Sequence, residues 1–79
     1  MRIEVKLFAS LAPYAAHPLV SSDGFLNVPS PVTVGEIADS LNIPHHEIKL
    51  IFINGVHGSL DMVVKDGDRL GFFPPIGGG

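Results

Sequence analysis

Alternating apolar and charged residues open the chain and predict its first strand. Residues 2–8 place isoleucine, valine and leucine at every second position, with charged residues between them. A period of two residues is typical of a strand that buries one face. We therefore expect a strand over residues 2–8. Because this segment is not a long apolar run, we do not expect a secretory signal.

The next segment carries weaker patterns. Ser10 is expected to cap a short helix over residues 11–16, where Pro13 falls in the first turn and is tolerated. Residues 21–24 (Ser-Ser-Asp-Gly) predict a turn, and residues 25–28 predict a second strand.

The clearest helix signal begins at Thr33. Thr33 and Glu36 have the spacing of a capping box, in which each side chain accepts a hydrogen bond from a free backbone N–H. Apolar residues then recur at spacings of three and four and form one stripe: Val34, Ile37, Ala38 and Leu41. We expect this helix to continue until Pro44 ends it.

Two further strands follow. Residues 49–53 are largely apolar, and Asn54-Gly55 directly after them is a strong hairpin signal. A short return strand at residues 56–57 is expected, then a turn at residues 66–68 and a last strand over residues 69–73.

This order of elements predicts an α+β fold. We expect a mixed sheet of four to five strands, one main helix packed on one face and a short extra helix after the first strand. The first and last strands can lie parallel at the sheet centre, which is the layout of a β-grasp domain. We expect a core built from the following residues: Ile3, Val5, Leu26, Val34, Ile37, Leu41, Ile51, Ile53, Leu70 and Phe72.

The amino-acid composition excludes several classes of function. The 79 residues include five basic and eight acidic side chains, a net charge of −3, and no cysteine. Without cysteine there is no disulfide, thiolate nucleophile or cysteine-based metal site. With no Lys/Arg cluster and no long apolar run, we expect no nucleic-acid partner, no membrane contact and a cytoplasmic location.

Other polar residues have plain interpretations. The four histidines, including the adjacent His45 and His46, are interpreted as surface residues, and no metal site is expected. Asp66 and Asp68 flank a glycine and are interpreted as turn formers and not as catalytic carboxylates.

The end of the sequence is its most unusual feature. Residues 1–73 are expected to form the domain and residues 74–79 a flexible tail. Pro74 and Pro75 favour an extended chain. Ile76 follows, and then Gly77 and Gly78, which have no side chains and can thread a narrow channel in a partner's active site.

Gly79 would present its terminal carboxylate there. A carboxylate must be activated before it reacts, most simply as an acyl-adenylate. The chain has no phosphate-binding loop, dinucleotide fingerprint or nucleophile arrangement that could do this. We therefore expect a carrier and not an enzyme.

The segment from Asp66 to Gly79, Asp-Gly-Asp-Arg-Leu-Gly-Phe-Phe-Pro-Pro-Ile-Gly-Gly-Gly, resembles the C-terminus of the MoaD/ThiS family of ubiquitin-like sulfur carriers. The Phe-Phe-Pro-Pro step is most similar to the small subunit of molybdopterin synthase. The resemblance implies that an E1-like enzyme uses ATP to adenylate Gly79. A sulfur-donating enzyme would then supply the sulfur of a thiocarboxylate.

In that role the chain is a stoichiometric sulfur donor that binds no cofactor itself. It would dock into the large subunit of molybdopterin synthase and supply sulfur for the dithiolene of the molybdenum or tungsten cofactor. Two alternatives share the activated glycine. One is a sulfur carrier for thiamine thiazole or another product, and the other is a protein modifier joined to lysine.

Comparison with the ubiquitin fold also indicates how the last strands face. It directs Ile51, Ile53, Leu70 and Phe72 inward. The same comparison leaves Leu50, Phe52 and Phe73 on the open face of the sheet, where we expect them to form a partner-docking patch.

Overall fold

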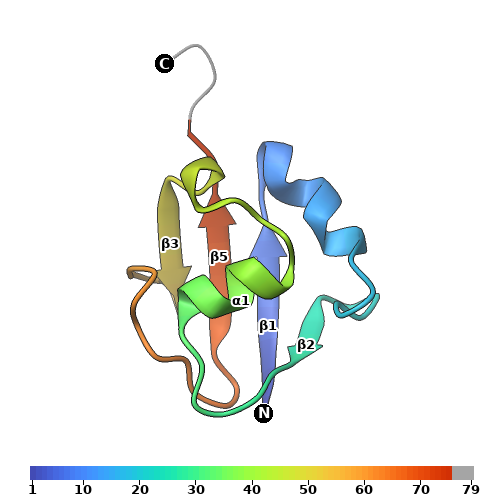
Figure 1. The fold of residues 1–79 in the computed structure, drawn as a ribbon, viewed down its shortest axis with the longest axis vertical. Coiled ribbons are helices and arrows are strands. Elements are labelled where there is room, and N and C mark those ends of the chain that lie inside the picture. Colours follow the sequence, from blue (N-terminus) through green and yellow to red (C-terminus); the bar gives the residue numbers. More distant parts are fainter. Residues whose placement is uncertain (76–79) are drawn as a thin grey trace.

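Two strands from opposite ends of the sequence lie side by side in the sheet (Figure 1). In the computed structural model, which describes residues 1–75, β1 (Arg2–Leu7) pairs in parallel with β5 (Arg69–Phe73). Val5 lies opposite Leu70 and Leu7 opposite Phe72. The predicted parallel pairing of the first and last strands is confirmed.

Three shorter strands complete the sheet. β2 (Phe25–Asn27) is antiparallel to β1, and β3 (Leu50–Ile53) is antiparallel to β5. β4 (Val56–His57) returns beside β3 after a turn in which Asn54 and Gly55 have φ values of 53° and 81°. Such positive values are those of the predicted hairpin turn. The strand order is β2-β1-β5-β3-β4, which confirms the predicted β-grasp fold.

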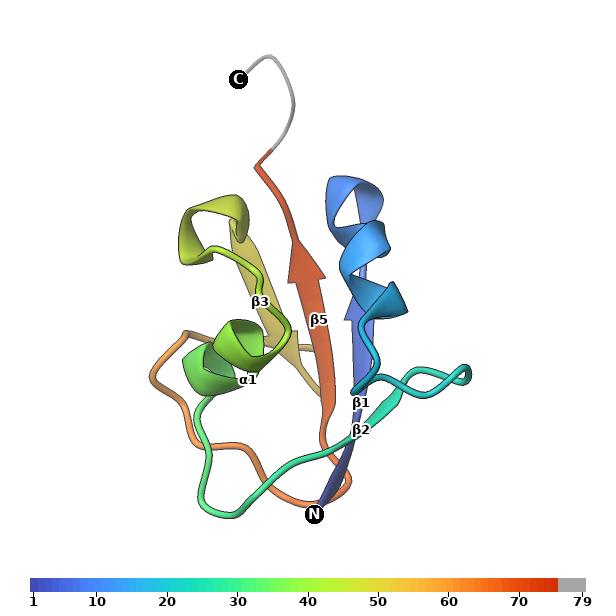
Figure 2. The same ribbon diagram turned by 45° about the vertical axis from the view of Figure 1, so that its right-hand side comes forward.

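The main helix, α1 (Val34–Ser40), lies across one face of the sheet (Figures 1 and 2). The predicted capping box is present. The Glu36 N–H donates to the Thr33 hydroxyl over 3.1 Å, and the Thr33 N–H donates to the Glu36 carboxylate over 2.9 Å. The helix ends earlier than expected, because Asn42 adopts a φ of 62° well before Pro44. Pro44 instead precedes an unpredicted 3₁₀ turn, η2 (His45–Glu47).

The first helix differs from its prediction. It is a 3₁₀ helix, η1 (Ala9–Ala16), and it begins before Ser10, which therefore does not cap it. Phe8 occupies the N-cap position without a side-chain hydrogen bond, and the Leu11 N–H donates to its carbonyl over 3.0 Å. Because Leu11 is fully buried, tertiary packing and not a polar cap sets where the helix begins.

The core lies between α1 and the sheet. All the residues predicted to be buried are buried, except Ile53. Ile53 is half-buried because it is the last residue of β3, and only the short strand β4 and a loop cover it. Sequence patterns missed further core residues that come from loops and from η1: Leu11, Val28, Val32, Ile43 and Val64. None of the three short helices in residues 1–75 has the length and hydrophobicity of a membrane-crossing segment.

Candidate functional site

Aromatic side chains gather on the face of the sheet opposite α1. The Phe8 and Phe73 rings are stacked, with centroids 4.2 Å apart and planes within 5°. Phe52 meets Phe73 edge-on, with centroids 5.6 Å apart. Leu50 pairs with Phe73 in the strand register and is 39% exposed. We call Phe8, Leu50, Phe52 and Phe73 the aromatic patch.

The patch contains every residue expected to dock a partner, together with Phe8, which sequence reasoning missed. The missed signal is the alternation in the first strand, which places Arg2, Glu4 and Lys6 on the outer side. Continuing that alternation by one step puts Phe8 on the same side. Exposed apolar clusters of this kind commonly mark a protein-binding surface.

The patch is adjacent to the start of the predicted tail. Phe73 is the last residue of β5, Pro74 is half-buried and Pro75 is exposed. The strand is held on both sides up to its end, because the Lys49 N–H donates to the Phe73 carbonyl over 2.7 Å and the Phe8 N–H donates to the Phe72 carbonyl over 3.2 Å.

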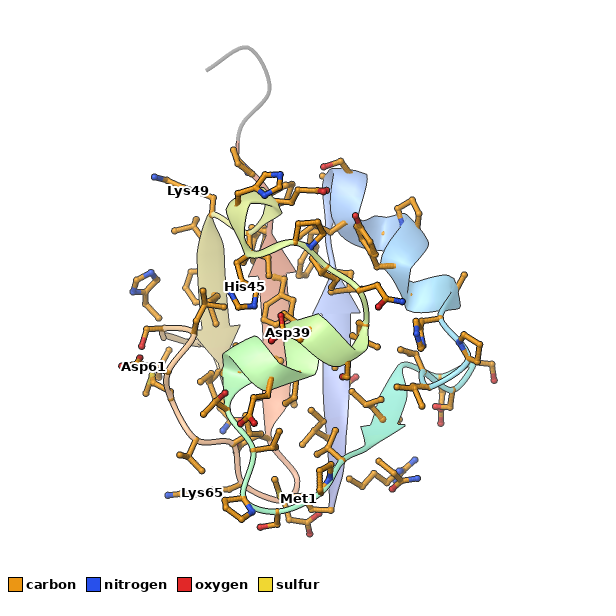
Figure 3. The ribbon with its side chains drawn as sticks, in the orientation of Figure 1. Met1, Asp39, His45, Lys49, Asp61 and Lys65 are labelled. Carbon is orange, nitrogen blue, oxygen red and sulfur yellow. The ribbon has the colours of Figure 1, made fainter. Side chains whose placement is uncertain are left out.

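Figure 3 labels Lys49 near this end of the sheet. The origin of the tail is therefore fixed relative to the patch. The predicted tail residues Ile76, Gly77, Gly78 and Gly79 lie outside the described residues.

A groove of about 390 Å³ continues from the patch along the open face. It is lined by Glu4, Lys6, Phe8, Phe52, Gly55, Arg69, Leu70, Gly71 and Phe73. Its apolar walls and few charged groups fit contact with a protein surface better than an enclosed catalytic site.

A polar contact joins the two short helices on either side of the end of β5 (Figures 1 and 2). The Tyr14 hydroxyl on η1 lies 3.3 Å from both carboxylate oxygens of Glu47 on η2. Desolvation, and secondarily the negative charge of Glu47, raises the pKa of Tyr14. This contact supports the end of the domain from which the tail starts.

His45 and the turn carboxylates have structural contacts. His45 Nε2 lies 2.8 Å from Asp39 Oδ1 and 3.2 Å from the Gly35 carbonyl, which ties η2 to α1 (Figure 3). The Asp68 carboxylate accepts from the Lys65 N–H over 2.8 Å, as predicted for a turn former, whereas the Asp66 carboxylate accepts from the Arg2 N–H over 2.8 Å and so ties the turn to β1. In the part of the chain that the structure describes, no three histidine, cysteine or acidic side chains are grouped to hold a metal ion.

These features define a class. Parallel terminal strands, one helix across a mixed sheet and an apolar open face are the architecture of a ubiquitin-like β-grasp protein. The chain belongs to the Mut7-C ubiquitin family, whose profile matches residues 1–76. Sequence comparison with curated proteins gives no significant match.

Solved structures support the same class. SAMP1 from Haloferax volcanii, small archaeal modifier protein 1, shares 27% identity, with all of both chains covered and a TM-score of 0.65. A putative molybdopterin converting factor, subunit 1, from Pyrococcus furiosus shares 25% identity over 96% of this chain and 99% of that one, with a TM-score of 0.64.

The predicted resemblance to ubiquitin-like carriers is confirmed at this level. The chain is a small ubiquitin-like protein related to both structures.

Proposed function

We propose that this protein is a sulfur carrier that acts through the carboxylate of Gly79. The observation that carries the proposal is the aromatic patch, which includes the last residue of β5 and directly precedes the sequence Pro-Pro-Ile-Gly-Gly-Gly. A protein that binds the patch receives the tail from a fixed starting point. Docking and delivery of Gly79 are thereby coupled.

The partner enzymes carry out the chemical steps, and this chain delivers the Gly79 carboxylate to their active sites. An E1-like enzyme joins the Gly79 carboxylate to the α-phosphorus of ATP, and pyrophosphate leaves. Hydrosulfide released by a sulfur-donating enzyme then attacks the acyl carbon and expels AMP. Loss of the remaining sulfur-bound proton gives a thiocarboxylate. Pro74 and Pro75 begin the tail, and Ile76, Gly77 and Gly78 lead the carboxylate into each active site. The chain needs no cofactor of its own for this role.

The product we favour is the dithiolene of the molybdenum or tungsten cofactor, with the large subunit of molybdopterin synthase as the acceptor. The Phe-Phe-Pro-Pro step before the glycines supports this choice. The similarity to a putative molybdopterin converting factor, subunit 1, supports it independently. The whole reaction sequence would take place in the cytoplasm. A sulfur carrier for thiamine thiazole or another product uses the same delivery.

A second candidate is a protein modifier joined through Gly79 to a lysine of a target protein. The similarity to a small archaeal modifier protein, which extends over all of both chains, specifically favours this role. Both functions begin with the same adenylate. They differ in the nucleophile that follows, which is sulfur in one case and an amine in the other.

A reconstituted reaction tests the carrier proposal. The chain is incubated with its E1-like enzyme, ATP and a sulfur source, and thiocarboxylate is measured by mass spectrometry. The intact chain should form it. A chain without Gly79, or with one residue added after it, should form none and should melt at the same temperature as the intact chain. A thiocarboxylate on the shortened chain would exclude Gly79 as the required site.

A further inference from the structure

Gly71 stands in the middle of β5 on the open face. A glycine inside a strand weakens it and often marks a place where another group approaches closely. Gly71 does not have a left-handed φ, and a Cβ atom there would lie 3.5 Å from a ring carbon of Phe8 and 3.9 Å from one of Phe73. These are ordinary contacts. Neither backbone conformation nor crowding therefore requires glycine at this position.

Gly71 lines the groove without contributing a side chain to it, and we call this part of the groove the hollow over Gly71. In the strand register Gly71 lies between Lys6 on β1 and Phe52 on β3. The stacked rings of Phe8 and Phe73 stand at one end of the hollow. The row of side chains that crosses β1, β5 and β3 at this register is therefore interrupted at Gly71, beside the aromatic patch.

The charge around the hollow is opposite to that of the whole chain. Lys6 and Arg69 both line the groove, and among residues 1–75 no carboxylate lies within 4 Å of either cation. Glu4 is the one acidic residue in the lining and lies opposite Arg69 in the register. Two cations against one carboxylate give a locally positive groove on a chain of net charge −3.

We propose that the hollow over Gly71 receives one leucine-like side chain of a partner protein, and that a carboxylate beside it on the partner pairs with Lys6 or Arg69. The aromatic side chains of Phe8, Phe52 and Phe73 select the apolar side chain, and the two cations select the carboxylate. A polyanion such as nucleic acid is disfavoured by Glu4 in the same groove. Gly71 is then the specificity-determining residue of the docking surface.

This inference deepens the proposed function by stating the chemistry of its docking partner, but its test needs neither ATP nor sulfur. The probe is a capped peptide with a central leucine between glutamate and aspartate, titrated into isotope-labelled protein and followed by amide chemical shifts. Two matched peptides replace the leucine by alanine or the acidic residues by lysines.

The acidic leucine peptide should shift the amide signals of Gly71, Phe52 and Phe73 in a saturable manner. The alanine peptide should bind about tenfold more weakly, the effect of losing one well-seated side chain. Gly71→Val should lose binding by a similar factor, and Gly71→Ala is used if the valine variant fails to fold. The double variant Lys6→Glu/Arg69→Glu should prefer the lysine peptide. Val63→Ser, at an exposed residue that does not line the groove, is the control.

The inference is overturned if the shifts lie away from Gly71, if no peptide binds saturably, or if Gly71→Val and Gly71→Ala bind like the native chain. Its failure is distinguishable from failure of the proposed function. The peptide can still bind if Gly79 forms no thiocarboxylate. The sulfur reaction can still be measured if no peptide binds.

Discussion

The neighbouring residues Phe72 and Phe73 belong to one strand but to two different environments. Phe72 has no exposed surface and lies in the core beneath α1. Phe73 is half-exposed on the opposite face, where it contacts Phe8 and Phe52. The pleat of a strand sends successive side chains to opposite faces. In β5, alternate positions therefore face the core and the open side of the sheet, and we propose that they serve stability and binding separately.

The difference extends over the two faces. The helix side is closed by aliphatic residues with almost no exposed surface, including Ile3, Ile37 and Leu70. The open side keeps large apolar groups in contact with solvent and leaves a hollow over Gly71. A domain of this size has little apolar surface to spare for stability. An apolar open face is thus better explained by a partner than by folding.

The largest effect should come from Phe72→Ala. Emptying a fully buried phenylalanine position costs about 3–5 kcal/mol. Small domains have only about 5–15 kcal/mol of unfolding free energy. We expect a large fall in the denaturation midpoint in urea, measured by circular dichroism. A variant that unfolds at the native midpoint would show that β5 faces the other way.

Phe73→Ala should have the opposite profile. Loss of the stacked contact with Phe8 should lower the unfolding free energy by about 1 kcal/mol. Binding to the E1-like enzyme should weaken by about 2 kcal/mol, measured by calorimetry, because aromatic residues often dominate an interface. Val63→Ala serves as the exposed control. If Phe73→Ala is less stable than Phe72→Ala, the two faces have been assigned in reverse.

A smaller effect is expected at the helix that closes the core. Thr33→Ala removes the hydroxyl that accepts from the Glu36 N–H, and loss of such a cap costs about 1 kcal/mol. Thr33→Ser keeps the hydroxyl and should retain most of the stability. Equal urea midpoints for the two variants would contradict a stabilising cap.

The smallest effect concerns Tyr14 and alkaline pH. The pKa of Tyr14 is raised in the folded chain, so its neutral phenol contributes to the stability of the fold at pH values below the ordinary pKa of 10.0. This contribution to stability is lost as the pH rises through the pKa of Tyr14 in the folded chain. The stability difference between the native chain and Tyr14→Phe should therefore shrink above that pH. Urea denaturation of both proteins at increasing pH measures it. If the stability difference between the native chain and Tyr14→Phe does not change with pH, titration of Tyr14 does not contribute to the stability of the fold.

Local patterns were sufficient for much of the fold. The alternation in β1, the capping box at Thr33 and the turn at Asn54-Gly55 each depend on residues close together in sequence. The inward direction of Leu70 and Phe72 additionally needed the comparison with the ubiquitin fold, because this strand is apolar on both faces. The other three features have local causes. These features are set by backbone geometry and short-range hydrogen bonds, which a sequence carries directly.

Features that depend on tertiary register were missed. Lys6 and Arg69 are 63 positions apart in sequence and form no cluster there, but the β1–β5 pairing brings them to one groove. The stacking of Phe8 on Phe73 has the same origin. Ser10 was assigned as a cap because its residue type favours that role, whereas burial of Leu11 decided where η1 begins.

Whether Gly79 carries sulfur can be measured from the intact mass of the chain. The chain is isolated after reaction with its E1-like enzyme, ATP and a sulfur source, and the C-terminal peptide is fragmented. We expect one oxygen of the Gly79 carboxylate to be replaced by sulfur, and we expect much less of this product from Phe73→Ala. If the free chain keeps an ordinary carboxylate at Gly79 and the remaining molecules of the chain are joined through Gly79 to lysines of other proteins by amide bonds, the sulfur-carrier role is contradicted.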